Sequence, residues 1–243
     1  MATQSAHIDR RPARPRNRLL SALPEKDFNR IAPELMAIPV RPRQTLQESG
    51  ERIRYVYFPN GGVFSVTTLL PDGTMVEAAT VGDEGMFCIE AYLHPDAVSP
   101  AHAMMQVPGA DVTRLGFKEF RREIDARGAL NDLVGRYAQV AVAQIMQSAA
   151  CNALHNVQER CARWLLMTQD RMHQQDFHLS HEFLAVMLGT RRPTVTTVAG
   201  ALQDAGLITY RHGHVTVLDR KGLEAAACQC YPLIRTQFDR LHV

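Results

Sequence analysis

The chain has 243 residues, of which 46% are hydrophobic and 21% are charged, as in an ordinary soluble globular protein of one or two domains. It contains no run of about 18 apolar residues and begins without an apolar signal segment, so we expect neither a membrane span nor secretion. The net charge of +2 is too small to indicate a nucleic-acid partner by itself, so the placement of charge must carry that argument.

The cysteine content indicates where the protein works. Five cysteines are an odd number in a long chain, which argues against a disulfide framework and favours a reducing compartment. We therefore expect a cytoplasmic protein whose cysteines are Cys88, Cys151, Cys161, Cys228 and Cys230.

The first 18 residues contain five arginines, a single acid and few apolar side chains. This composition predicts a disordered basic tail over residues 1–18, with a phosphate-touching arm as the alternative. From Asn17 to about Ala37, apolar residues recur at three- and four-residue steps and predict a helix. Pro33 and Pro39 limit its extent.

Between residues 40 and 117 the apolar period changes to two. Residues 53–58, 63–70 and 74–81 are predicted strands rich in aromatic and β-branched side chains, and Gly-containing turns separate them. Short strands at this regular spacing predict a small antiparallel barrel or roll.

The stretch from Ala129 to His155 predicts one long helix, interrupted by neither Gly nor Pro except at Gly135. We interpret it as a dimerisation helix with a near-heptad seam. The alternative is a core helix packed on its own barrel. A second helix, residues 157–172, carries apolar residues at helical spacing and is expected to be core. The predicted seam residues are Leu133, Tyr137, Val140, Gln144 and Cys151.

Residues 178–204 have the pattern of a helix-turn-helix. Ser180 is a suitable N-cap for a short helix that Gly189 ends, since a helix often closes through a left-handed residue. A second helix follows with Pro193 in its first turn, and Val195, Val198 and Leu202 form its buried stripe.

The exposed side of this second helix carries no acid before Asp204, which suits insertion into a major groove. Arg191 and Arg192 are the leading candidates for reading base edges. Residues 207–218 then predict a hairpin with a Gly-containing turn, the wing of a winged helix. The predicted DNA-binding residues are Arg191, Arg192, Thr194, Thr196 and Thr197 of the helix, with Arg211 and His212 of the wing.

The segment from Ser180 to Ile208 resembles the helix-turn-helix signature of the Crp/Fnr regulators, and so does the order of roll, long helix and winged helix. The resemblance extends over nearly all of the chain after residue 18. It implies a cyclic-nucleotide-binding-like N-terminal domain and a homodimer whose two recognition helices enter successive major grooves of a palindromic site. It also implies that an input at the roll or long helix repositions these helices.

Departures from the family pattern concern the effector. Members that bind cyclic AMP hold the ribose with a Gly-Glu pair, and this chain has Gly82-Asp83 at that place. They hold the phosphate with an Arg, and the corresponding residues 99–102 of this chain include no Arg. A cyclic phosphate would lack a cationic partner, so we expect no cyclic AMP binding of the usual kind. We predict no cofactor and leave the effector unidentified, with Gly82, Asp83 and Glu84 as candidate pocket residues.

The recognition helix also departs from the family pattern. Pro193 stands where the family often has an acid, and Thr197 where it often has an Arg, so the target sequence should differ from the best-known family site. No cysteine precedes Cys88, which excludes the N-terminal iron–sulfur cluster of some members.

Two weaker patterns concern metal and redox chemistry. Cys151 and His155 share one helix face, and two such pairs across a dimer would offer metal ligands. The simpler interpretation is that both are small or polar residues of the dimer seam. The Cys228-x-Cys230 motif is too short to specify a site. The alternative hypothesis is that one of these two cysteines is a redox-active thiol. We predict no metal. Nucleophile-elbow and P-loop motifs are absent, so we expect no enzyme.

Together these patterns predict an α+β protein: a tail (1–18), an antiparallel β-roll (19–127), a dimerisation helix (128–155) and a winged helix-turn-helix (156–243). The predicted function is a bacterial, sequence-specific transcription regulator. Its expected partners are double-stranded DNA and a second copy of itself, with RNA polymerase as a further candidate and no membrane. The competing hypothesis is a ligand or redox sensor that acts mainly through protein–protein contacts.

Overall fold

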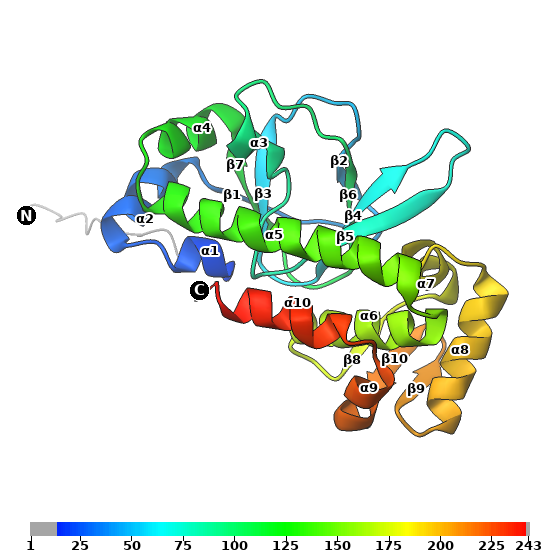
Figure 1. Cartoon of the computed structure of the whole chain (residues 1–243). Coiled ribbons are helices and arrows are strands. Elements are labelled where there is room, and N and C mark those ends of the chain that lie inside the picture. Colours follow the sequence, from blue (N-terminus) through cyan, green and yellow to red (C-terminus); the bar gives the residue numbers. More distant parts are fainter. Residues whose placement is uncertain (1–13, 242–243) are drawn as a thin grey trace, which may run out of the picture.

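The computed structural model describes residues 14–241 (Figure 1). The N-terminal half holds two antiparallel sheets with strand orders β1-β7-β3 and β2-β6-β4-β5. The strands are β1 (Met36–Ile38), β2 (Thr45–Gln47), β3 (Tyr55–Pro59), β4 (Val63–Leu69), β5 (Met75–Val81), β6 (His102–Val107) and β7 (Val112–Gly116). The predicted antiparallel roll is therefore confirmed.

Short helices flank the roll, and a long helix runs along it (Figure 1). They are α1 (Arg18–Ser21), α2 (Glu25–Ile31), the 3₁₀ turn η1 (Ala32–Glu34), α3 (Glu90–Leu93), α4 (Phe117–Asp125) and α5 (Ala129–Leu154). The roll is filled by aromatic side chains: the ring of Phe87 stacks on Tyr57 at 4.7 Å and on Phe64 at 5.1 Å.

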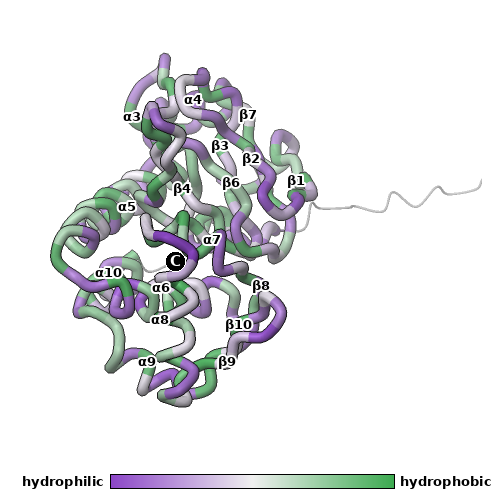
Figure 2. Tube along the Cα trace, turned by 90° about the vertical axis from the view of Figure 1, so that its right-hand side faces the viewer, coloured by the Kyte–Doolittle hydropathy of each residue, from purple (hydrophilic) through white to green (hydrophobic). Residues whose placement is uncertain are grey.

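The C-terminal part forms a second hydrophobic core around the buried Trp164. Its elements are α6 (Val157–Met172), β8 (Asp176–His178), α7 (His181–Met187), α8 (Arg192–Asp204), β9 (Ile208–Arg211), β10 (His214–Val217), α9 (Arg220–Ala226) and α10 (Cys230–Asp239). Figure 2 shows the roll above, the helix-turn-helix part below, and α5 and α10 side by side between them. No helix among residues 14–241 has both the length and the apolar character needed to cross a membrane.

The N-terminal segment differs from the prediction. Instead of one helix from Asn17 to Ala37, the chain forms α1, α2 and η1. Pro24 stands at the N-cap position of α2 and Pro33 in the first turn of η1, and neither residue can continue a preceding α-helix. The predicted tail is too long at its C-terminal end: Asn17 is buried and donates to the carbonyl oxygens of Pro59 and Gly85. Residues 1–13 of that tail lie outside the described residues.

The long helix α5 has the predicted length, but the residues predicted to form its dimer seam face the interior of their own chain. Leu133, Tyr137, Val140, Gln144 and Cys151 are all buried within the same chain. Helix α5 packs on β5 and α10, and Gln144 Nε2 donates to the carbonyl oxygen of Thr80 at 3.2 Å. The alternative, a core helix packed on its own roll, is therefore correct for this face.

Candidate nucleic-acid interface

The turn between α7 and α8 is built by local chemistry. Ser180 Oγ accepts from the backbone N–H of Phe183 and caps α7. Gly189 adopts φ +57° just past the helix, a conformation that side chains with a Cβ disfavour. The N–H of Thr190 then donates to the carbonyl oxygen of Ala185 at 2.9 Å and closes the turn. The predicted helix-turn-helix is thus present.

Helix α8 divides into a buried and an exposed face. Val195, Val198 and Leu202 are buried against α6 and α7, as the spacing predicted. The opposite face presents exposed Arg191, Arg192, Pro193, Thr196 and Thr197, while Thr194 is half-buried. Neither arginine forms an ion pair with any residue from 14 to 241, so both guanidinium groups are available to an anionic partner.

The threonine hydroxyls on this face bond to their own helix. Thr196 Oγ1 donates to the carbonyl oxygen of Arg192, and Thr197 Oγ1 to that of Pro193, both at 3.2 Å. With their hydrogens used in this way, the two side chains offer their methyl groups to a partner, and Thr197 also offers an oxygen lone pair, whereas Thr196 Oγ1 lies 3.1 Å from His181 Nδ1. These groups suit contact with a thymine methyl or with a donor on a base edge.

Three residues outside the predicted DNA-binding set hold the recognition helix in place. The His181 ring lies 4.1 Å from the Tyr210 ring, and its Nδ1 is 3.1 Å from Thr196 Oγ1. Gln203 Oε1 accepts from the backbone N–H of Tyr210 at 2.8 Å, which joins α8 to the wing. Burial, and then the charge of Arg192, lowers the pKa of His181, so its imidazole is neutral at neutral pH.

The wing is a tight hairpin between β9 and β10. His212 (φ +51°) and Gly213 (φ +80°) take the two left-handed positions of a type I′ turn, whose twist matches that of the strands. Arg211 and His212 are exposed at the tip. The His214 ring instead meets the His178 ring edge-on at 5.2 Å, so it helps to join β10 to β8.

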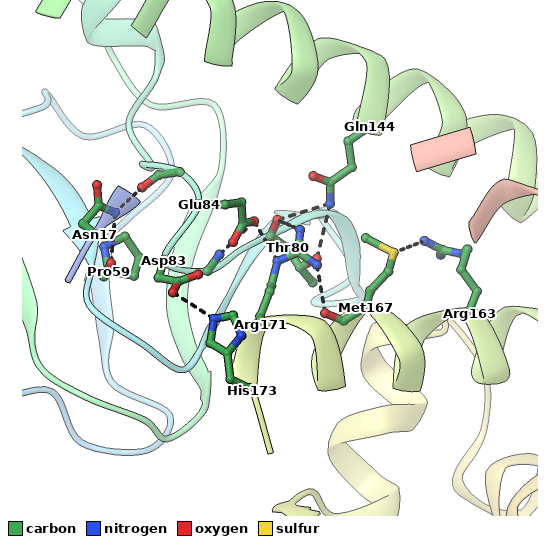
Figure 3. Close-up of polar contacts among 12 residues, drawn as sticks. Asn17, Pro59, Thr80, Asp83, Glu84, Gln144, Arg163, Met167, Arg171 and His173 are labelled. Atoms are coloured by element: carbon green, nitrogen blue, oxygen red, sulfur yellow. Dashed lines mark hydrogen bonds and ion pairs between the residues drawn. The ribbon is translucent and has the colours of Figure 1, made fainter. Parts of the chain in front are cut away.

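The candidate effector residues lie at the joint between the roll and α6 (Figure 3). The buried Glu84 carboxylate pairs with Arg171 Nε at 2.8 Å, and Asp83 Oδ2 is 3.0 Å from His173 Nε2. The adjacent cavity, bounded by α6 and α10, has a volume of about 190 Å³. This is below the roughly 300–1,000 Å³ of pockets for drug-sized ligands. The two pairs join the roll to α6.

A second polar contact crosses the same joint. Glu77 of β5 is half-buried, but its carboxylate accepts from Trp164 Nε1 at 3.0 Å and from Ser65 Oγ at 2.6 Å, both buried residues. Burial raises the pKa of Glu77 from 4.5 to about 7, against the opposing effects of these hydrogen bonds and of Arg163 and Arg171.

This raised pKa predicts a pH-dependent stability. Below pH 4.5 Glu77 is protonated in both states; between about 4.5 and 7 only the unfolded chain releases the proton, so the free energy of unfolding falls as pH rises. The Glu77→Gln variant, which does not titrate, should lack this component. Urea unfolding of both proteins from pH 4.5 to 8 measures it, and a difference that stays constant over this range would contradict the assignment.

Known proteins resemble this chain in its helix-turn-helix and in its overall fold. A family model described as a Crp-like helix-turn-helix domain matches residues 159–226. Among solved structures, FixK2 from Bradyrhizobium japonicum is 16% identical over 80% of this chain and 98% of its own, with a TM-score of 0.69. A Crp/Fnr-family regulator of Eubacterium rectale is 16% identical over 87% and 98%, with a TM-score of 0.67.

A transcriptional regulator of the CRP family from Thermus thermophilus, TTHB099, is 26% identical over 79% of this chain and 95% of its own, with a TM-score of 0.62. No curated protein sequence matches the chain at a significant level. The structural likenesses show a shared fold, and the domain match shows the helix-turn-helix.

Proposed function

We propose that this chain, which has the fold of a Crp/Fnr-type transcription regulator with a helix-turn-helix DNA-binding domain, binds a palindromic DNA site as a homodimer. The observation that carries the proposal is the exposed N-terminal end of α8, where Arg191 and Arg192 have no acidic partner among residues 14–241. In helix-turn-helix proteins this end of the second helix meets base edges.

The residues divide by the kind of contact expected. Arg191 and Arg192 would read guanine through paired hydrogen bonds, and Thr194, Thr196 and Thr197 would line the groove beside them. Arg211 and His212 at the tip of the wing would contact backbone phosphates, which set position and affinity without specifying sequence.

The exposed face of α5 supports dimerisation. Ala138, Val142, Ile145 and Ala149 recur at alternating four- and three-residue steps on the side away from the roll. Val142 is 54% exposed and Ile145 42% exposed, an unusual state for branched apolar side chains on a regular helix. The 4-3-4 spacing is that of a coiled-coil seam, and the alanines let a second copy of α5 approach closely.

An acidic residue in this seam should therefore separate the protomers. We expect Ile145→Glu to be monomeric in analytical ultracentrifugation at concentrations where the unaltered chain is dimeric, since two carboxylates would meet across the seam. Leu93→Glu is the matched control, because Leu93 is an exposed apolar residue (69%) on a different helix, α3. A dimeric Ile145→Glu would place the interface elsewhere.

Dependence on cyclic AMP is not expected. His102, in the segment where the resemblance would place a phosphate-binding Arg, has its Nδ1 2.5 Å from Glu48 Oε2, and Glu84 is occupied by Arg171. The segment around His102 therefore offers a cyclic phosphate no arginine, and its imidazole is already paired with Glu48.

Selection of bound duplexes from a randomised DNA pool tests the function. The purified chain would be used at near-physiological salt with no added ligand, because affinity for DNA depends strongly on salt. We expect a palindrome with half-sites about 10 base pairs apart. Recovery of no specific sequence, with or without cyclic AMP, would overturn the proposal.

A further inference from the structure

Four potential metal ligands gather at the C-terminal end of α5. Cys151, His155, Cys228 and Cys230 each offer one ligand atom, and these four atoms all lie within 4.8 Å of one another. The three cysteines are buried and His155 is half-buried. Among residues 14–241 this is the one group of three or more His, Cys, Asp or Glu residues arranged in this way.

Two distant segments supply the ligands. Cys151 and His155 lie one helical turn apart on α5, so their side chains share a face. Cys228 and Cys230 come from the short link between α9 and the start of α10, and α10 runs alongside α5 (Figure 1). Both pairs belong to the same chain, so the site needs no second copy.

The distances fit a single tetrahedral ion. A Zn–S bond of about 2.3 Å makes the edge of a regular tetrahedron of sulfurs about 3.8 Å. Here Cys151 Sγ and Cys228 Sγ are 3.4 Å apart, and Cys230 Sγ is 3.5 Å from His155 Nδ1. The sulfur separation is far longer than the 2 Å or so of a disulfide. An iron–sulfur cluster would spread the ligands further, because they would be shared among two or four irons.

The surroundings suit thiolate ligands. Gln147 Nε2 donates to Cys230 Sγ at 3.0 Å, the kind of outer hydrogen bond that orients a metal ligand. The positive charge of Arg163 acts on both Cys151 and Cys228. Arg163 is buried, forms no ion pair within residues 14–241, and its Nε has no hydrogen-bond partner there.

The charges also balance. Three thiolates, one neutral imidazole and one divalent ion carry a net charge of −1. Arg163 acts on the Glu77 carboxylate only over a distance longer than that of an ion pair, so an anionic site beside it would further compensate its buried guanidinium.

We infer that Cys151, His155, Cys228 and Cys230 form a structural zinc site. Four protein ligands leave no open position, which is the coordination of a structural rather than a catalytic zinc. The ion ties the end of α5 to the segment before α10. Helix α6, the first helix of the DNA-binding part, begins at Val157, two residues after His155. The site would therefore fix the connection between α5 and the DNA-binding part.

Metal analysis of the full chain tests this. The protein would be purified with a non-thiol reductant and no added metal, and zinc would be counted by mass spectrometry. We expect about one zinc per chain, and, after exchange, the intense visible bands of tetrahedral Co²⁺ with a thiolate-to-cobalt charge-transfer band. Cys228→Ser should bind Zn²⁺ more than about 10-fold more weakly, since even loss of an outer-sphere partner costs that much.

Two variants keep the test decisive. Cys161→Ala, a buried cysteine outside the group, should keep both the zinc and the cobalt spectrum. His155→Cys should keep the metal and move the cobalt spectrum towards that of a site with four thiolates. The spectrum would not move if His155 did not bind the metal. Unaltered chain without stoichiometric zinc and without the cobalt–thiolate band would overturn the inference, as would a Cys151–Cys228 disulfide in its place.

Discussion

Replacing Arg192 with alanine is expected to abolish sequence-specific DNA binding, with a loss of about 1–3 kcal/mol per half-site and about twice that for the dimer. The side chain is exposed in the first turn of α8, where the helix meets base edges. It has no acidic partner among the described residues, so removing it should leave the free energy of unfolding within about 0.5 kcal/mol. The loss would therefore report on DNA contact and not on folding.

The measurement is titration of the selected palindrome and of a scrambled duplex at several salt concentrations. Arg122→Ala is the matched control, because Arg122 is an exposed arginine on α4, at the far end of the molecule from α8 (Figure 1). Arg211→Ala provides a contrast: loss of a phosphate contact weakens binding to both duplexes alike and lowers the salt slope by about 1. If Arg192→Ala bound its palindrome undiminished, α8 would not be the reading helix.

Arg171→Met is expected to lower the free energy of unfolding by about 3–5 kcal/mol. Arg171 and Glu84 are both almost fully buried, at 6% and 7% side-chain exposure, with 2.8 Å between Nε and Oε1 (Figure 3). Arg171 also donates to the carbonyl oxygens of Thr80 and Met167. Without the guanidinium, Glu84 would be left as a buried carboxylate with no counter-charge, which is the main origin of the loss.

A double-mutant cycle separates this cause from lost packing. Adding Glu84→Gln to Arg171→Met removes the orphaned charge, so the double variant should recover much of the stability. Asp125→Asn is the control, because its partner Arg121 forms a surface pair worth no more than about 1 kcal/mol. Urea unfolding should be followed at one protomer concentration, since dimerisation adds to stability. A loss below about 1 kcal/mol for Arg171→Met would show that the pair does not hold the joint.

Local sequence determined the DNA-binding part almost completely. Ser180 as a cap, Gly189 in a left-handed conformation and Pro193 in a first turn act over a few residues, so their chemistry can be identified without knowing the rest of the fold. The strands of the roll were also predictable, because their period-two pattern and Gly-containing turns are local features.

Tertiary structure alone decided which face of α5 meets the roll. Apolar and small residues occur nearly all round this helix, and so Leu133 and Val142 look equivalent until the roll covers one of them. It also decided the partners of Glu84 and Cys151, which lie 87 and 77 residues away along the chain. Such contacts depend on how whole elements pack, and no local propensity records that.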